Sequence, residues 1–281
     1  MSPVHDQSYR RYQGTREARG RGWLIIAGAG IRAMLSRRAF LGLLILAWLP
    51  FLVGTVQIYA VTMYPQAGEM LPVNAGMFQA FVERQGLFAF FVTIYAGAGL
   101  IANDRRANAL QVYLSKPILR IEYIAGKLAV LATFLLGVTL LPAVLLVVMQ
   151  LVLSGNVNLL REHSTLIPAV ILASLMRVIV PSVTMLALSS ISRSARYVAV
   201  MYTGVIFFAE AMYGVLSFVT GSTRVAWVSI TGNFNVVTDA IFRQAPRYDT
   251  PVAVSFLVLI GLVVVSISVL ERSVRGVEIV S

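Results

Sequence analysis

Six apolar stretches, each close to the length that a helix needs to cross a bilayer, constrain this chain most. They cover residues 39–64, 86–102, 128–153, 166–190, 197–220 and 251–270. A helix crosses the roughly 30 Å hydrocarbon layer with about 20 residues, and these runs are too long for strands and lack the alternation of an outer-membrane barrel. With 58% hydrophobic and 12% charged residues, little remains outside them. The predicted fold class is an all-α polytopic membrane protein with six transmembrane helices.

The charged residues divide the chain into a tail and one membrane domain. Residues 1–21 form a basic tail without the apolar core of a secretory signal, so the first span is expected to be an uncleaved signal anchor. Residues 22–281 form a single transmembrane domain. Within it Trp23–Phe40 has apolar residues on one side and three arginines near its end, which favours an interfacial elbow helix. The alternative is an extended start to the first span.

Lysine and arginine set the expected orientation. With the N-terminus inside, 17 of the 23 basic residues lie on the cytoplasmic side, five lie outside and one lies within a span. This bias predicts that both termini are cytoplasmic, and the expected location is a bacterial inner (plasma) membrane. The net charge of +11 is then explained by contacts with anionic membrane lipids, and no nucleic-acid partner is expected.

The polar segment 100–127, LIANDRRANALQVYLSKPILRIEYIAGK, separates the second and third spans. Asn103 or Asp104 can cap a helix, and Pro117 keeps Lys116 out of a helical conformation, so a helix of about three turns is predicted over Asp104–Ser115. A second helix is expected from about Arg120. The predicted first helix has an apolar face of Ala107, Leu110 and Leu114, with Tyr113 alongside, and a polar face of Arg105, Asn108 and Gln111. Such a helix can dock on a partner or simply connect two spans.

The residues in and around this segment resemble the permease subunits of type-2 ABC exporters. The resemblance is carried by Gly97, Gly99 and Asp104, followed by Leu114, Ser115, Lys116, Pro117, Ile118, Arg120, Glu122, Tyr123, Gly126 and Lys127. Lys116 replaces the arginine that is frequent in that family. The resemblance implies that Asp104–Ser115 is a cytoplasmic coupling helix, and that 191–196 is a second contact. The ATPase-coupling candidates are Asp104, Arg105, Ala107, Asn108, Leu110, Gln111, Tyr113, Leu114, Lys116, Pro117, Arg120 and Glu122.

The chain has no phosphate-binding loop of its own. Gly126–Lys127 has neither an upstream glycine-rich loop nor a following Ser or Thr. The resemblance therefore implies that ATP and Mg bind to two copies of a separate ABC ATPase subunit, and that a second permease copy or paralogue completes the transport path. Motifs for enzymes are missing from the sequence, and neither a cofactor nor a metal site is expected in this chain. The competing function is an ion-coupled secondary transporter or a channel.

Arg177 in the fourth span and Glu210 in the fifth are the charges expected deep in the bilayer. Their depths differ by only a few ångströms at 1.5 Å per residue, so an intramembrane charge pair is predicted. The pair can be a static link between two helices or part of the transport path. Pro50, Pro142 and Pro181 are expected to bend their spans. The loops 65–85 and 221–250 are expected outside, the first with a short surface helix and the second with a turn near Gly232–Asn233.

Overall fold

The computed structural model describes residues 21–64, 66–109, 119–155, 161 and 164–275, and all regular structure in these ranges is helical. Six helical segments are long and apolar enough to cross a membrane, namely Arg38–Met63, Ala75–Arg106, Arg120–Ser154, Leu166–Ile191, Ala195–Thr220 and Val252–Val274. Each overlaps one of the six predicted spans. The protein is therefore a multi-pass membrane protein with an all-α fold.

Several spans consist of more than one helix. The elements in chain order are α1 (Gly22–Leu35), α2 (Arg38–Ala47), α3 (Leu49–Met63), α4 (Ala67–Met70), α5 (Ala75–Val92), the π-helical turn η1 (Thr93–Gly97), α6 (Ala102–Arg106), α8 (Arg120–Val138), α9 (Leu140–Ser154), α11 (Leu166–Ile191), α12 (Ala195–Thr220), the 3-10 turn η2 (Thr223–Val228), α13 (Ile230–Ile241) and α14 (Val252–Arg275).

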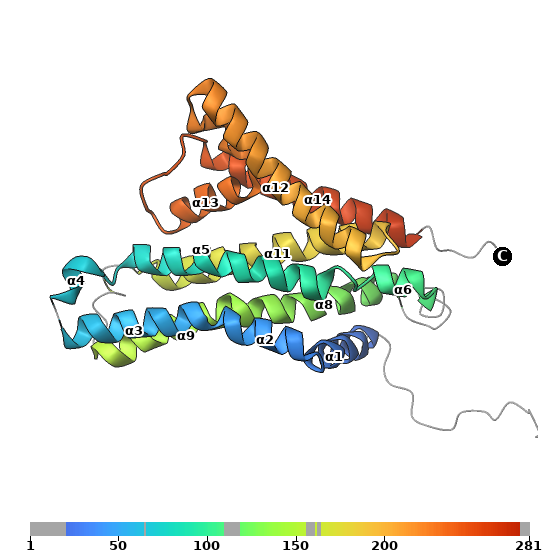
Figure 1. The fold of residues 1–281 in the computed structure, drawn as a ribbon, viewed down its shortest axis with the longest axis horizontal. Coiled ribbons are helices and arrows are strands. Elements are labelled where there is room, and N and C mark those ends of the chain that lie inside the picture. The colour runs from blue at the N-terminus through green and yellow to red at the C-terminus, as the bar shows by residue number, and fades with distance from the viewer. Residues whose placement is uncertain (1–20, 65, 110–118, 156–160, 162–163, 276–281) are drawn as a thin grey trace, which may run out of the picture.

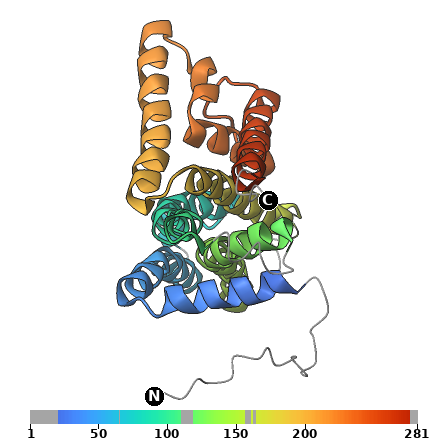
Figure 2. The same ribbon diagram turned by 90° about the vertical axis from the view of Figure 1, so that its right-hand side faces the viewer.

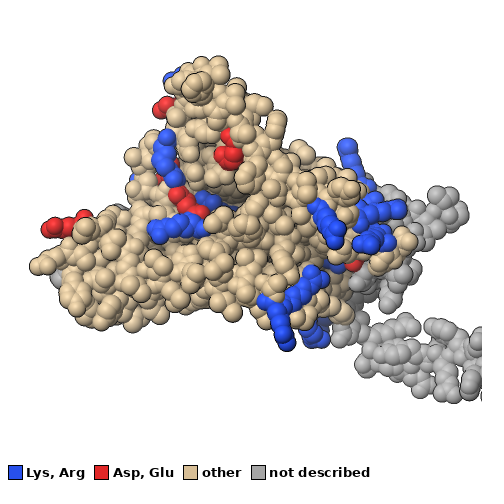
Figure 3. Space-filling model, in the orientation of Figure 1, with Lys and Arg blue, Asp and Glu red and all other residues tan. Residues whose placement is uncertain are grey.

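The helices form two groups. In Figure 1 α2, α3, α5, α8, α9 and α11 run side by side along the long axis, whereas α12, α13 and α14 form a second group on the α11 side. The helices α1 and α6 and the end of α14 lie at one end of the molecule, and α13 lies toward the other (Figure 1). Lys and Arg side chains gather at the end that holds α1 and α6, the basic end of the molecule (Figure 3).

Two of the three prolines coincide with breaks in their spans. The first span is interrupted at Trp48, two residues before Pro50, and the third at Thr139, three residues before Pro142. Pro142 has no N–H to donate to the Val138 carbonyl. The amide of Gln85 on α5 is fully buried, and its nitrogen is assigned to the side of two carbonyls because only a donor satisfies them. In this orientation it lies 3.3 Å from the Val138 carbonyl and 3.2 Å from the Ala47 carbonyl at the other break. Gln85 therefore supplies a donor at both breaks and fixes α5 between them.

The first helix crosses the start of the third span. Figure 2 shows α1 lying crosswise to the long helices, and it packs on α8. A Cβ atom on Gly126 of α8 would lie 2.9 Å from the Trp23 carbonyl oxygen and 2.8 Å from Ile26 Cβ. Gly126 thus allows the close crossing of α1 and α8. This accounts physically for one glycine of the ABC-like motif, while the position of α1 at a membrane interface stays a prediction.

Two segments that are predicted to be outer loops differ from the sequence-based expectation. The surface helix expected within 65–85 is the first part of α5, so the second span begins at Ala75 rather than at residue 86. The turn expected at Gly232–Asn233 lies inside α13. Gly232 and Asn233 take part in the N-terminal cap of α13 instead. Ser229 Oγ accepts from the Gly232 N–H at 2.6 Å, and Asn233 Nδ2 donates to the Ser229 carbonyl at 2.7 Å.

Candidate functional site

At the basic end, hydrogen bonds hold α6 against α11. Ser189 Oγ accepts from the N–H groups of Ile101 at 3.1 Å and Ala102 at 3.0 Å, and donates to the Ala98 carbonyl at 2.9 Å. The Arg105 guanidinium donates to the Ser190 carbonyl. Because Ser189 is fully buried, these bonds are shielded from water and strengthened. The start of the polar segment is therefore fixed to the fourth span.

A second set of contacts holds α6 against α8. Lys127 Nζ lies 2.7 Å from Asp104 Oδ2, and the two side chains are 12% and 19% exposed. The Tyr123 hydroxyl donates to the same oxygen at 2.8 Å, and the ammonium lies 5.5 Å from the Tyr123 ring centroid. Asp104, Tyr123 and Lys127, which belong to the ABC-like motif and are up to 23 residues apart in sequence, thus form one cluster.

The predicted helix Asp104–Ser115 differs from the structure in its first half. The helix α6 begins at Ala102 and ends at Arg106, and Asn108 adopts a positive φ of 51°, a conformation that interrupts a helix and that asparagine tolerates better than most residues. Ala107 and Asn108 are exposed. The candidates Leu110, Gln111, Tyr113, Leu114, Lys116 and Pro117 lie outside the described residues.

The two remaining candidates begin the third span. Arg120 is the first residue of α8. Glu122 is buried, and its Oε2 accepts from the Leu119 N–H at 3.0 Å, so it stabilises the start of the helix, where unpaired N–H groups favour a carboxylate. Glu122 is therefore enclosed by its own helix start, and Arg120 marks the point at which the chain returns to the bundle.

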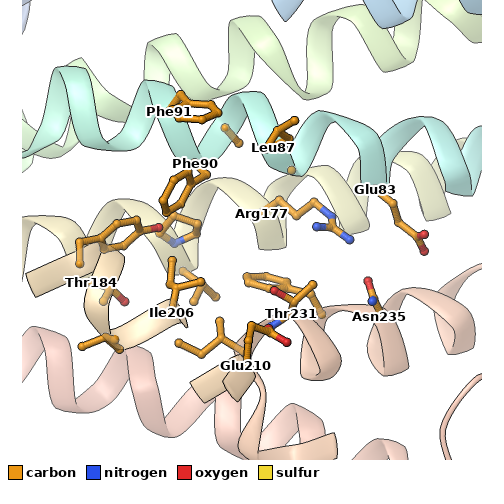
Figure 4. A pocket seen from close by; sticks show the side chains of 18 of the residues that line it. Glu83, Leu87, Phe90, Phe91, Arg177, Thr184, Ile206, Glu210, Thr231 and Asn235 are labelled. Carbon is orange, nitrogen blue, oxygen red and sulfur yellow. The ribbon is translucent and has the colours of Figure 1, made fainter. Parts of the chain in front are cut away.

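A cavity of about 690 Å³ lies between the two groups of helices. Its walls come from α5, α11, α12 and α13, with one residue from α14 (Figure 4), and the space-filling surface is hollowed where the two groups meet (Figure 3). Apolar and aromatic residues dominate the lining. Its charged residues are Glu83, Arg84, Arg177 and Glu210. A mostly apolar cavity with a few polar groups is typical of a small-molecule site.

Arg177 and Glu210 both line this cavity, but no ion pair joins them among the residues that the structure describes. The predicted pairing differs from the structure because α13, a helix that the sequence reading missed, supplies other partners. Glu210 Oε1 accepts from Ser229 Oγ at 2.7 Å and from the Thr231 N–H at 3.1 Å. Glu210 thus links α12 to the start of α13.

The Arg177 side chain extends into the space between α5 and α13 (Figure 4). It is 6% exposed, its Cζ lies 5.3 Å from the Phe234 ring centroid, and a Cβ on Gly86 would lie 2.9 Å from its Nη1. Its Nε and Nη2 have no hydrogen-bond partner within the described part of the chain. A buried cation with unused donors costs several kcal/mol in a membrane, so this arginine is the most unusual group in the cavity.

A carboxylate cluster lies beside the cavity. Arg247, in the segment after α13, contacts Asp239 through Nη2 at 2.6 Å and Glu83 through Nη1 at 2.9 Å. Hydrogen bonds to Asp239 and Glu83 raise the pKa of Arg247, so its charge is permanent. Glu83 attracts Arg177 electrostatically, but the hydrogen bonds that it accepts come from Arg247 and from Gln79, whose amide donates at 3.0 Å.

The sequence patterns predict little of this site, because they favour loops for the segments on both sides of it. Glu83 and Gly86 were expected at or before the start of the second span, and Phe234 was expected in a loop. A helical reading of 75–92 would have placed Glu83, Gly86 and Phe90 on one face, since they are spaced by three and four residues. Nothing in the sequence alone would have brought α13 against Arg177.

No protein-family model matches this chain, and no curated protein matches it in sequence. The likeness to ABC permeases accordingly rests on the motif residues, of which Asp104, Tyr123 and Lys127 meet in space.

Proposed function

We propose that this chain is the transmembrane permease subunit of an ATP-driven ABC transporter, and that it acts as an exporter. It forms a translocation path together with a second permease copy or paralogue. A separate ABC ATPase subunit, present in two copies, binds ATP and Mg. The complex lies in the inner (plasma) membrane of a bacterial cell, with both termini and the basic end in the cytoplasm.

The observation that carries the proposal is the course of the second span. Its outer part, α5, lines the cavity, and its last turn, α6, begins the polar segment. Between them lies the π-helical turn η1, a feature that is frequent at functional sites within helices. One continuous element therefore connects a candidate substrate cavity with the segment that resembles a coupling helix.

The contacts of α6 support a mechanical role for this element. Asp104 and Arg105 tie α6 to α8 and α11 by charged hydrogen bonds, so a displacement of the polar segment acts on three spans at once. The exposed Ala107 and Asn108 that follow are accessible to a partner. These features suit a subunit that receives motion from another chain, which the lack of a phosphate-binding loop in the sequence also requires.

Purification of the tagged chain from its own membrane in mild detergent tests the proposal. We expect a second chain with a phosphate-binding loop to co-purify and to hydrolyse ATP. Ala107→Asp should reduce its recovery at least tenfold, whereas Ala245→Asp, an equivalent change at an exposed alanine of the opposite end, should not. Isolation of the chain alone, together with substrate movement driven by a proton or sodium gradient, would establish the ion-coupled transporter instead.

A further inference from the structure

The cavity contains a positive charge whose donors are unused. Arg177 is held in place from both sides, by the small Gly86 on α5 and by the Phe234 ring on α13, yet its Nε and Nη2 find no acceptor among the described residues. Buried polar groups are normally hydrogen-bonded, and a guanidinium presents a planar fork that matches a carboxylate or phosphate. A carboxylate or phosphate group is the acceptor that these donors match best.

The carboxylates of the cavity do not fill this role. Glu83 accepts hydrogen bonds from Arg247 and Gln79, and Glu210 accepts from Ser229 and Thr231. No ion pair joins either carboxylate to Arg177 within the part of the chain that the structure describes. Arg177 remains available to a molecule that enters the cavity.

Beyond Arg177 the cavity wall is aromatic. Phe90 of α5 stacks on Tyr202 of α12 with ring centroids 5.9 Å apart, and it meets Phe207 edge to face at 6.4 Å. Phe91 and Phe207 also line the cavity and are 48% and 63% exposed. The cavity therefore extends from a buried cation to the apolar surface of the spans, where an acyl or alkyl chain in the bilayer has access.

We propose that this cavity binds an amphipathic anion, with its carboxylate or phosphate group on Arg177 and its apolar chain along Phe90, Tyr202 and Phe207. The inference rests on the proposed function in that it names the substrate class of the transport path. The binding itself needs neither ATP nor a partner chain. Either an anionic phospholipid of the bilayer or a free amphiphile has this chemistry.

Equilibrium binding of radiolabelled oleate to the purified full-length chain in phosphatidylcholine nanodiscs tests the proposal. We expect oleate to be displaced by dodecyl phosphate and not by oleyl alcohol, which has a similar chain without the charge. Arg177→Gln should weaken oleate binding at least tenfold. The matched control is Arg224→Gln, since Arg224 is exposed and does not line the cavity, and it should change the affinity less than threefold.

The comparison of oleate with oleyl alcohol uses the unaltered protein, so it decides the matter even if Arg177→Gln does not fold. Equal affinity for the two compounds, or unchanged oleate binding by a folded Arg177→Gln, would overturn the proposal. Nanodiscs that contain phosphatidylglycerol distinguish the sources: competition with oleate identifies a phospholipid headgroup, and its lack identifies a free amphiphile. No ATPase is present in this assay. Oleate binding can therefore be found even if the chain is not an ABC permease, and a lack of oleate binding would not argue against the ABC assignment.

Discussion

Replacement of Asp104 by Asn should loosen α6 from α8 without changing the shape of the side chain. Asp104 Oδ2 receives Lys127 Nζ at 2.7 Å and the Tyr123 hydroxyl at 2.8 Å. A hydrogen bond to a charged group contributes about 1.5–3 kcal/mol. Asn retains an acceptor for Tyr123 but removes the charge, and the pair is partly exposed, so we expect a loss of about 2 kcal/mol. This corresponds to a roughly 30-fold increase in the local opening equilibrium.

Hydrogen exchange monitored by mass spectrometry measures this opening directly. The amides of Ala102–Arg106 should exchange roughly 30-fold faster in Asp104→Asn, with no change in α12. Asp249→Asn is the matched control, because Asp249 is exposed at the opposite end and accepts a neutral bond from Thr223 at 2.8 Å. Unchanged protection of α6 in Asp104→Asn would refute the idea that this cluster anchors the polar segment to the third span.

Three further changes test how the spans are held. Gly126→Val places atoms against the Trp23 backbone, so it should displace α1, destabilise the protein by about 1–3 kcal/mol and change the fluorescence of that tryptophan. Gln85→Leu leaves two buried carbonyls without a donor and should cost about 1–3 kcal/mol in detergent unfolding, unlike a change at the exposed Gln66. Arg247→Gln should cost about 2 kcal/mol, a value reduced for its partial exposure. The carboxylates raise the pKa of Arg247. The contribution of its ion pairs to the free energy of unfolding is therefore fully present below the ordinary pKa of arginine, and it should not decrease up to about pH 10.

The spans could be predicted because the bilayer imposes one requirement on each of them. A run of about 20 apolar residues satisfies its backbone within a helix, and this local rule locates all six segments to within a few residues at most ends. Pro50 and Pro142 likewise mark the breaks, since a missing N–H acts within four residues of the proline. The predicted second span is too short because polar residues such as Glu83 and Arg84 interrupt its apolar run. The partner of Glu83 is Arg247, which is distant in sequence and meets it only in the folded chain.

The cavity could be predicted only in part, because its contacts are tertiary. Their positions in the fourth and fifth spans predict similar depths in the bilayer for Arg177 and Glu210. The partners of Glu210, however, are Ser229 and Thr231 at the start of α13. The turn-forming residues Gly232 and Asn233 favour a loop locally, yet Ser229 uses them to begin a helix. In the polar segment, sequence periodicity could not anticipate the positive φ of Asn108, two residues after the end of α6.

Transport of a fluorescent fatty acid in proteoliposomes tests directly whether this chain is an ATP-driven exporter of amphipathic anions. The vesicles contain either this chain alone or this chain with its co-purified ATPase, and they are energised in turn by ATP with Mg and by an ion gradient. We expect the fatty acid to move only when both chains and ATP are present, and this movement to be lost in Asp104→Asn and Arg177→Gln. Gradient-driven movement by this chain alone would contradict this expectation.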